Sequence, residues 1–301
     1  MDRARRGAVE WPTLALLVLC YAGWAIGTTW AAALWLPLGV GLCGLCIALH
    51  SSLSHEVLHG HPFRTRRLNE ALVFPALTLL IPYQRFRDTH LAHHRDAVLT
   101  DPYDDPETNY LDPALWRNLP RWVQAVLQAN NTLAGRMLIG PLVGQVSFMA
   151  SDWRAVRSGD GAVLRGWLWH FPAVALVLIW VKAAPMPIWA YLCAAYLGLS
   201  VLKIRTFLEH RAADRANART VIVEDRGPLA LIFLNNNLHV VHHAHPKLAW
   251  YELPMRYAQN RAHYQARNEG YVYRSYAEVF QRHFWRAKDP VPHPLWPWRR
   301  G

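Results

Sequence analysis

Charged side chains are scarce in this sequence, and two long stretches almost lack them. Of its 301 residues, 18% are charged and 52% are hydrophobic. Residues 11–54 contain no Asp, Glu, Lys or Arg, and residues 166–202 contain a single charge, Lys182. A helix made of the first stretch, which has 44 residues, would be about 66 Å long, roughly twice the hydrocarbon thickness of a bilayer. Each stretch therefore predicts a hairpin of two membrane-spanning helices.

The predicted spans cover residues 12–29, 33–53, 165–182 and 187–208, with a tight turn near residues 28–32. The first span is expected to stay uncleaved, because the apolar sequence continues past residues 31–33, where a signal peptide could end. Residues 71–84 and 137–151 are uncharged but would reach only about 21 to 22 Å as helices, so they are expected to be re-entrant or interfacial. The predicted fold is an all-α membrane protein of one domain, residues 1–301, with a cytoplasmic cap of residues 85–163 and 209–301.

Cysteine is rare and never lies in a polar setting. Cys20, Cys43, Cys46 and Cys193 all fall in apolar stretches. This argues against a disulfide framework and against thiolate ligands for zinc or an iron–sulfur cluster. A metal must then be held by other side chains, and electrons for redox chemistry must come from a separate protein.

Acidic residues are outnumbered, 21 against 32 Lys and Arg, which gives a net charge of +11. Arg3, Arg5 and Arg6 are expected to keep the N-terminus in the cytoplasm, and even numbers of crossings return the chain to that side before His55 and before His210. Most arginines then lie on the cytoplasmic side. This distribution explains the net charge without nucleic acid as a partner.

Histidine, in contrast, is abundant and grouped. Nine of the 16 histidines form two triplets of identical spacing, one pair, and one single residue after the fourth span: His90, His93 and His94; His239, His242 and His243; His55 and His59; and His210. Positions i, i+3 and i+4 of a helix share a face, so each triplet is expected to aim three imidazoles at one point. Neutral imidazoles gathered at a membrane boundary are costly to desolvate unless a cation binds them. All nine are therefore predicted metal ligands.

Nine ligands exceed what one zinc ion needs, since structural zinc takes four and catalytic zinc takes three and a water. Two octahedral irons offer about twelve positions, which leaves room for water or dioxygen beside nine nitrogens. The expected cofactors are therefore two non-haem iron ions.

The segments HEVLH (residues 55–59), HLAHH (90–94) and HVVHH (239–243) resemble the three histidine boxes of the membrane fatty acid desaturase and hydroxylase superfamily. Residues 205–210 are similar to the segment that supplies an extra ligand in that family, and residues 100–107 and 245–251 resemble bacterial fatty acid desaturases. The resemblance implies an enzyme of the bacterial cytoplasmic membrane, with both termini and a diiron centre in the cytoplasm. It also implies that dioxygen is used to introduce a C=C bond into a lipid or acyl thioester, with electrons from a ferredoxin, rubredoxin or cytochrome.

Polar residues beside the boxes are candidates for orienting the ligand rings through hydrogen bonds, which metal sites usually require. They are Glu56, Asp88, Glu209 and Asn236. The acidic run after the second box is interleaved with proline, and is interpreted as a loop whose carboxylates pair with nearby arginines. It contains Asp101, Asp104, Asp105 and Glu107.

Three alternatives remain open. HEVLH also fits the HExxH motif of zinc metalloproteases, although seven box histidines would then have no role. Hydroxylases and carotenoid ketolases of the same superfamily use similar boxes, and the spacing of the boxes does not encode the reaction. A metal carrier in the membrane would be expected to have polar residues near the midplane, where these spans are almost free of them.

Overall fold

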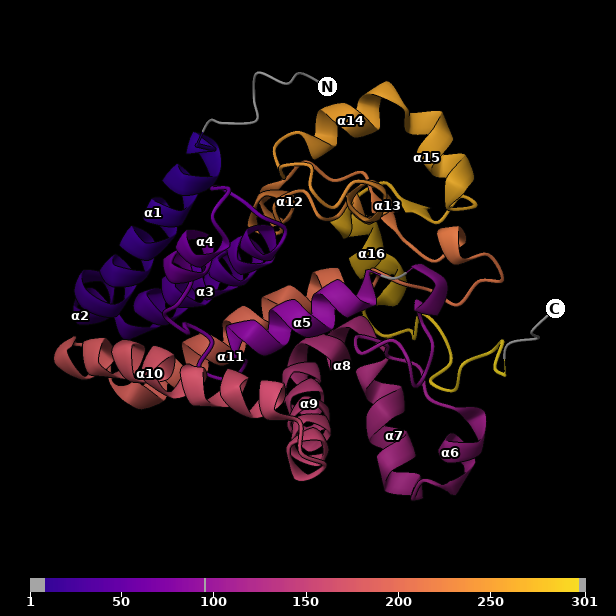
Figure 1. Cartoon of the computed structure of the whole chain (residues 1–301), viewed down its shortest axis with the longest axis horizontal. Helices are drawn as coiled ribbons and strands as arrows, with labels where there is room; N and C mark the ends of the chain where they lie inside the picture. The colour runs from indigo at the N-terminus through magenta and orange to yellow at the C-terminus, as the bar shows by residue number, and fades with distance from the viewer. Residues whose placement is uncertain (1–8, 95, 298–301) are drawn as a thin grey trace. The chain divides into compact units, whose positions relative to one another are not determined.

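The structure is a computed structural model that describes residues 9–94 and 96–297, and it is mostly helical (Figure 1). Arg3, Arg5 and Arg6, on which the predicted orientation rests, lie outside the described residues. The chain divides into two compact units. Unit 1 contains the chain up to Arg87, Ser147–Val201 and Ala249–Tyr251, and unit 2 contains Asp88–Val146, Leu202–Leu248 and the chain from Glu252 onward.

Unit 1 holds the long apolar helices that the sequence predicts. They are α1 (Trp11–Ile26), continued by the π-helical turn η2 (Gly27–Ala31) and α2 (Ala32–Leu34); α3 (Leu36–Leu58); α10 (Gly161–Ala183); and α11 (Ile188–Thr206), of which residues 202–206 belong to unit 2. Four helical segments of the described chain are long and apolar enough to cross a membrane: Trp11–Leu34, Leu36–Leu58, Gly161–Ala183 and Ile188–Thr206. The prediction of a mostly helical membrane protein with four candidate membrane-spanning helices is confirmed.

The sequence predicts the turn of the first hairpin at residues 28–32, but the structure has helix there. The hydroxyls of Thr28 and Thr29 donate to the carbonyl oxygen of Ala25, at 3.0 and 2.7 Å, so both find partners without a turn. The chain turns at Trp35, whose backbone is extended. Pro37 then occupies the first turn of α3, where its missing N–H costs no helical hydrogen bond.

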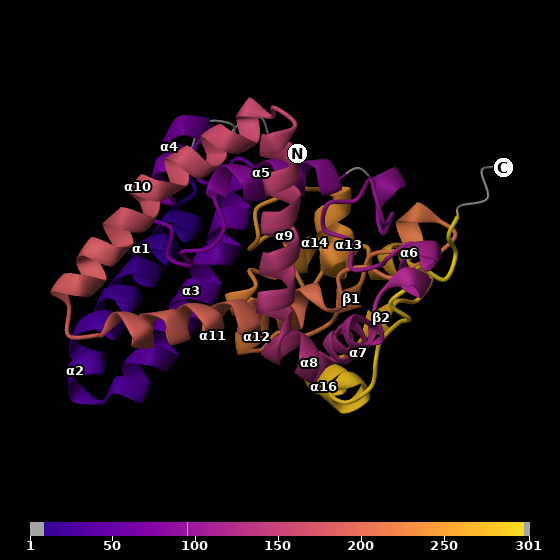
Figure 2. The ribbon, with the colours of Figure 1, turned by 90° about the horizontal axis from the view of Figure 1, so that it is seen from below.

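Glycines let α3 approach its neighbours closely, and Figure 2 shows α3 beside α1 and α11. A Cβ atom on Gly198 of α11 would lie 2.8 Å from the carbonyl oxygen of Gly44 in α3. On the other side, a Cβ atom on Gly39 of α3 would lie 2.8 Å from the carbonyl oxygen of Gly27. The helix that carries the first histidine box is therefore packed backbone to backbone against both neighbours.

The two shorter uncharged segments differ from each other. Within residues 71–84, α4 (Arg66–Leu72) ends, a non-helical stretch contains Pro75 and Pro82, and α5 (Tyr83–His93) begins. The break that these prolines predict is confirmed. Residues 137–151 instead form the end of α8 (Leu133–Leu138) and much of the continuous helix α9 (Gly140–Arg157).

Unit 2 consists of short helices around a small core. Its further elements are the 3-10 turns η3 (Asp96–Val98) and η4 (Ala216–Ala218), α6 (Pro113–Asn118), α7 (Arg121–Asn130), α12 (Pro228–Ile232), α13 (His239–Ala244), α14 (Leu253–Gln259), α15 (Arg261–Arg267), α16 (Tyr276–His283), and the strands β1 (Ile222–Val223) and β2 (Val272–Tyr273). The strands pair in parallel, Ile222 with Val272 and Val223 with Tyr273. A buried core holds α13 against β1, α14 and α15; it contains Ile222, Leu238, Val240, Val241, Leu253, Tyr257 and Tyr264. This packing fixes the helix that carries the third histidine box.

Candidate metal centre

Four imidazoles of unit 2 converge in a four-histidine cluster, formed by His93, His210, His239 and His243. One ring nitrogen from each lies within 4.8 Å of all the others. Nε2 of His210 is 2.8 Å from Nε2 of His93 and 3.1 Å from Nε2 of His239. His93 lies on α5, His239 and His243 lie on α13, and His210 follows α11. Three separate parts of the chain therefore supply the cluster.

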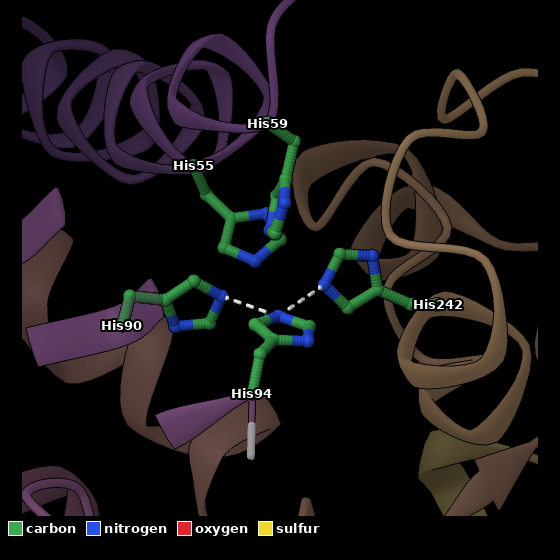
Figure 3. Close-up of side chains that lie close together, drawn as sticks. All are labelled: His55, His59, His90, His94 and His242. Carbon is green, nitrogen blue, oxygen red and sulfur yellow. Dashed lines mark hydrogen bonds between the residues drawn. The ribbon is translucent and has the colours of Figure 1, made fainter. Parts of the chain in front are cut away.

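Three further imidazoles of unit 2 form a three-histidine cluster, His90, His94 and His242. Nε2 of His94 is 2.9 Å from Nε2 of His90 and 3.1 Å from Nε2 of His242. Figure 3 shows the ring of His94 between the other two rings, with their nitrogens directed toward one another. Seven of the nine predicted ligands thus gather within one unit.

Each HxxHH triplet divides between the two clusters, which corrects the expectation that it aims three imidazoles at one point. The first and last histidines of a triplet join one cluster, and the middle histidine joins the other. A helix turns about 100° per residue, so the side chains at positions i+3 and i+4 point about 100° apart, one on each side of position i. The second and third histidines of a triplet therefore point in different directions. The second box gives two rings to the three-histidine cluster and one to the four-histidine cluster, and the third box does the reverse.

The first box lies in unit 1, at the end of α3. His55 is in the last turn of the helix, and His59 is its C-cap. The two rings, which Figure 3 also labels, have centroids 4.9 Å apart. His55 is buried. The helix therefore presents the two imidazoles as a preformed pair.

Side-chain oxygens hold the far side of three ligand rings. Oδ1 of Asp105 is 2.7 Å from Nδ1 of His93, and Oε1 of Glu107 is 3.0 Å from Nδ1 of His90. Oδ1 of Asn236 is 3.0 Å from Nδ1 of His239. The Nδ1–H group of each ring then donates to the oxygen, and the unprotonated Nε2 directs its lone pair toward the cluster. Such hydrogen bonds select the tautomer that can bind a metal.

The sequence-based interpretation of Asp105 and Glu107 as loop carboxylates paired with arginines is incomplete, because each carboxylate also holds a histidine ring. The side chain of Asp105 is only 1% exposed. Its other oxygen accepts the backbone N–H of Thr100 at 2.8 Å, which folds the loop back onto α5. One sequence feature could have indicated this role: the acidic run is flanked by prolines and directly follows a histidine box. Prolines favour turns, and a turn at this place can bring a carboxylate back to the helix that precedes it.

The other three residues predicted to orient ligand rings lie in different settings. Glu56 accepts the backbone N–H of Trp250 at 2.8 Å and lies 3.7 Å from Nε2 of His61. Glu209 lies 3.1 Å from Nε of Arg205 and 4.0 Å from Nδ1 of His239. Asp88 is exposed on α5.

Burial and neighbouring charges set the protonation of the clusters. Burial, together with adjacent imidazoles, lowers the pKa of His210 and His239 well below the ordinary value, so both rings are neutral. Burial also acts to lower the pKa of His93, but the carboxylates of Glu107 and Asp105 outweigh it and raise that pKa to about 9. Burial acts to raise the pKa of Glu107, but His90 and His93 hold it well below the ordinary value. Glu107 is therefore ionised, and His93 must release a proton to bind a metal.

The spacing of the ring nitrogens fits metal coordination. With a metal–nitrogen distance of about 2.1 Å, adjacent ligands lie about 3.0 Å apart in an octahedron and about 3.4 Å apart in a tetrahedron. The four Nε2 pairs described above are separated by 2.8 to 3.1 Å. When no cation is present, a ring nitrogen can donate a hydrogen bond only if it carries a proton. Ring nitrogens without a proton face one another with their lone pairs, and these lone pairs repel. A nitrogen-rich set of this kind suits a borderline metal such as iron or zinc.

Comparisons with known proteins agree with the fold and the clusters. A sequence model described as "Fatty acid desaturase" matches residues 28–277. The chain is 25% identical over 246 residues to a beta-carotene ketolase of Paracoccus sp. (strain PC1), which covers 79% of this chain and 78% of the relative. It is 24% identical over 234 residues to a beta-carotene ketolase of Paracoccus sp. (strain N81106 / MBIC 01143), with 76% of each chain covered. The family match includes all three histidine boxes and most of the chain, so the protein is an integral membrane oxidoreductase that belongs to the fatty acid desaturase family.

Proposed function

We propose that the chain is a membrane-bound, O2-dependent fatty acyl desaturase that holds two non-haem irons through nine histidines. The observation that carries this proposal is the pair of histidine clusters whose Nε2 atoms converge while oxygens hold Nδ1 of His90, His93 and His239. When bound, the two irons would supply the activation of dioxygen needed to remove hydrogens from an unactivated hydrocarbon chain. The nine ligands are His55, His59, His90, His93, His94, His210, His239, His242 and His243.

The four-histidine cluster would hold one iron, and the three-histidine cluster together with His55 and His59 would hold the other. The assignment of His55 and His59 rests on the order and spacing of the boxes and on the pairing of their rings on α3. A set of four ligands and a set of five leave open positions on two octahedral ions. Those open positions are what a dioxygen-dependent reaction requires.

The protein's own contribution is to orient the ligands and to control charge. Asp105, Glu107 and Asn236 fix the ring tautomers through Nδ1. The carboxylates of Asp105 and Glu107 place negative charge behind two rings, which strengthens them as donors to a cation. We also propose that Glu209 assists His239 from its position 4.0 Å away, and we keep Glu56 and Asp88 as candidates for orienting ligands.

A carotenoid ketolase is the second candidate function. It is favoured by the two ketolase relatives, each aligned over about three quarters of this chain. Both reactions act on long apolar chains, and the same metal centre would serve both. They differ in whether a second hydrogen is removed or oxygen is retained in the product, which depends on how the substrate is held.

The remaining parts of the proposal follow from the sequence. The substrate would be a lipid or an acyl thioester, and the electron donor would be a separate ferredoxin, rubredoxin or cytochrome. The location would be a bacterial cytoplasmic membrane, with both termini and the metal centre on the cytoplasmic side. The excess of arginine outside the spans supports this orientation.

Expression in two hosts tests the reaction. In a host without desaturases, total lipids are analysed by gas chromatography with mass spectrometry, and new unsaturated acyl chains are expected. In a second host that accumulates beta-carotene, pigments are analysed by liquid chromatography. Keto-carotenoids there, with unchanged acyl chains in the first host, would establish the second candidate and reject the first.

Metal analysis tests the centre itself. The purified chain should contain about two irons, and His210→Ala should lower the iron content and abolish product. His283→Ala, which changes a half-buried histidine at the end of α16 outside both clusters, is the matched control. One zinc and no iron would instead support the metalloprotease alternative, in which only the HEVLH segment binds metal.

A further inference from the structure

A basic recess opens on unit 2, outside the histidine clusters. Its volume is about 420 Å³, and it is lined by Ala244, His245, Arg256, Asn260, His263, Tyr264 and Arg267. These residues come from the C-terminal end of α13 and from α14 and α15. No carboxylate appears among the described residues that line the recess. The size is within the range of small-molecule sites.

Each polar side chain that lines the recess has a group that can donate a hydrogen bond. Two guanidiniums carry a fixed positive charge, and the amide of Asn260 and the exposed ring of His263 can donate beside them. The hydroxyl of Tyr264, a buried residue of the lining, lies 3.0 Å from Nε2 of His245. Two fixed positive charges in one recess favour an anion.

The neighbouring Arg261, which lies on α15 between Arg256 and Arg267 in sequence, is paired with Glu224 at 2.7 Å and does not line the recess. The charged side chains in the described lining are those of Arg256 and Arg267. A guanidinium presents a planar fork of donors that matches an oxyanion in a bidentate manner.

We propose that this recess binds a phosphate group, held by Arg256 and Arg267 with His263 and Asn260 as additional donors. Phosphate is favoured over a single carboxylate because it offers three peripheral oxygens and a charge of about −1.5 to −2, which suits a lining that contains two guanidiniums and two further donors. The group would come from a lipid head group or from a soluble phosphoryl compound. The recess begins one residue after His243, so it would anchor the phosphate end of a molecule next to the helix that carries the third histidine box.

Binding of inorganic phosphate to the full chain in detergent, measured by equilibrium dialysis with radiolabelled phosphate, tests this site. Wild type should bind saturably. Arg256→Gln and Arg267→Gln should each weaken binding about ten-fold or more, as expected for a hydrogen bond to a charged group. Arg274→Gln removes an exposed arginine of unit 2 outside the recess and should leave the affinity unchanged. Should either arginine variant fail to fold, the exposed ring of His263 provides a milder variant, His263→Gln.

A second arm separates the two sources of phosphate. Native mass spectrometry of the chain in mixed micelles records bound phosphatidylglycerol. A lipid adduct that is displaced by inorganic phosphate and lost in Arg256→Gln identifies the head group, whereas binding of inorganic phosphate alone identifies a soluble ligand. Equal phosphate affinity in wild type and both arginine variants overturns the proposal. A second result would also overturn it: wild type binds poly-glutamate but shows no saturable phosphate binding, and both arginine variants lose the binding to poly-glutamate. That result would assign the recess to an acidic protein partner.

The phosphate site does not depend on the proposed metal centre. Dialysis is repeated on protein from which metal has been removed by a chelator, and phosphate affinity should persist. A chain that binds phosphate but contains no iron would reject the proposed function while leaving this site intact.

Discussion

At the scale of single residues, the proposed metal centre depends on side chains that are not among the proposed ligands. Asp105 binds the Nδ1 side of His93 through one oxygen and the backbone N–H of Thr100 through the other. Glu107 holds His90 in the same manner. One short loop thus holds a histidine ring in each of the two clusters.

Asp105→Asn should lower the iron content of the purified protein, because the neutral amide cannot strengthen His93 as a donor or select its tautomer as firmly. Loss of such a partner typically costs 10- to 100-fold in metal affinity. Glu107→Gln should have a similar effect through His90. Iron is measured by inductively coupled plasma mass spectrometry after dialysis against a weak chelator. Asp104→Asn, an exposed change in the same loop, should retain full iron; equal iron in all three variants would contradict the role given to Asp105 and Glu107.

His293 makes the fold of unit 2 sensitive to acid. The ring is buried; its Nε2 lies 3.2 Å from the hydroxyl of Thr100, and Nδ1 accepts the N–H of Leu295. Burial, aided by Arg219, lowers the pKa of His293 to about 4. Because this folded-state pKa lies below the unfolded value of about 6.5, the unfolded chain binds the proton more tightly, and stability falls as the pH drops from about 6.5 toward 4.

His293→Gln should therefore reduce the loss of stability between pH 7 and pH 5. The measurement is the thermal unfolding midpoint of wild type and variant in detergent at both values. The variant should be less stable than wild type at pH 7, and the difference should shrink at pH 5. A constant difference between the two proteins would show that His293 does not titrate on unfolding.

Sequence reasoning points to the proposed ligands more readily than to the residues that support them. Six of the nine histidines stand out because the two triplets have the same spacing, and the other three follow predicted spans. Asp105 does not stand out, because an acidic residue in a proline-rich loop looks the same whether it faces water or a buried ring. Only the fold of residues 100–107, with Thr100 at a positive φ of 68°, brings that carboxylate back to α5.

At the scale of helices, close packing rather than hydrophobicity alone fixes the first histidine box. The contact between Gly198 and the backbone of Gly44 leaves no room for a side chain between α11 and α3. In a bilayer, where apolar side chains gain little by leaving lipid, such small-residue contacts are a main source of helix association.

Gly198→Ala should destabilise the protein by about 1 to 3 kcal/mol, the typical cost of overpacking. The added methyl would meet the carbonyl oxygen of Gly44 at 2.8 Å and Ile47 at 2.8 to 2.9 Å. Gly41→Ala is the matched control, since a Cβ there meets nothing within 4 Å. Unfolding by sodium dodecyl sulfate, followed by tryptophan fluorescence, gives the comparison. Equal midpoints for the two variants would argue against the packing described for α3 and α11.

The elements are predictable where one property dominates the segment. Uncharged runs predict the four long helices, and Pro75 and Pro82 predict the break before α5. The turn at Trp35 is not predictable in this way, because Thr28 and Thr29 can end a helix or satisfy their hydroxyls within it. The parallel pair β1 and β2 joins residues about fifty positions apart, so no local pattern indicates it.

At the scale of the whole molecule, metal should contribute to stability as well as to chemistry. The four-histidine cluster joins three parts of unit 2 that are distant in sequence: α5, the segment after α11, and α13. A ligand that binds only the folded state stabilises it by about 2.7 kcal/mol when present at 100 times its dissociation constant.

Removal of iron by a chelator should therefore lower the thermal unfolding midpoint by several degrees, and added ferrous iron should restore it. Differential scanning fluorimetry gives the midpoint, and elemental analysis confirms the removal. His210→Ala should show a smaller response to the chelator than wild type. An unchanged midpoint after complete removal of iron would contradict a role for the clusters in holding unit 2 together.

The loop of residues 100–107 also ties the order of folding to the proposed metal centre. The second box can form as soon as α5 does, but the hydrogen bonds to Nδ1 of His90 and His93 wait until the loop has closed through Asp105 and Thr100. Before that closure, either nitrogen of these two rings can carry the proton. We therefore expect these two rings to become selective metal ligands only after the loop has folded.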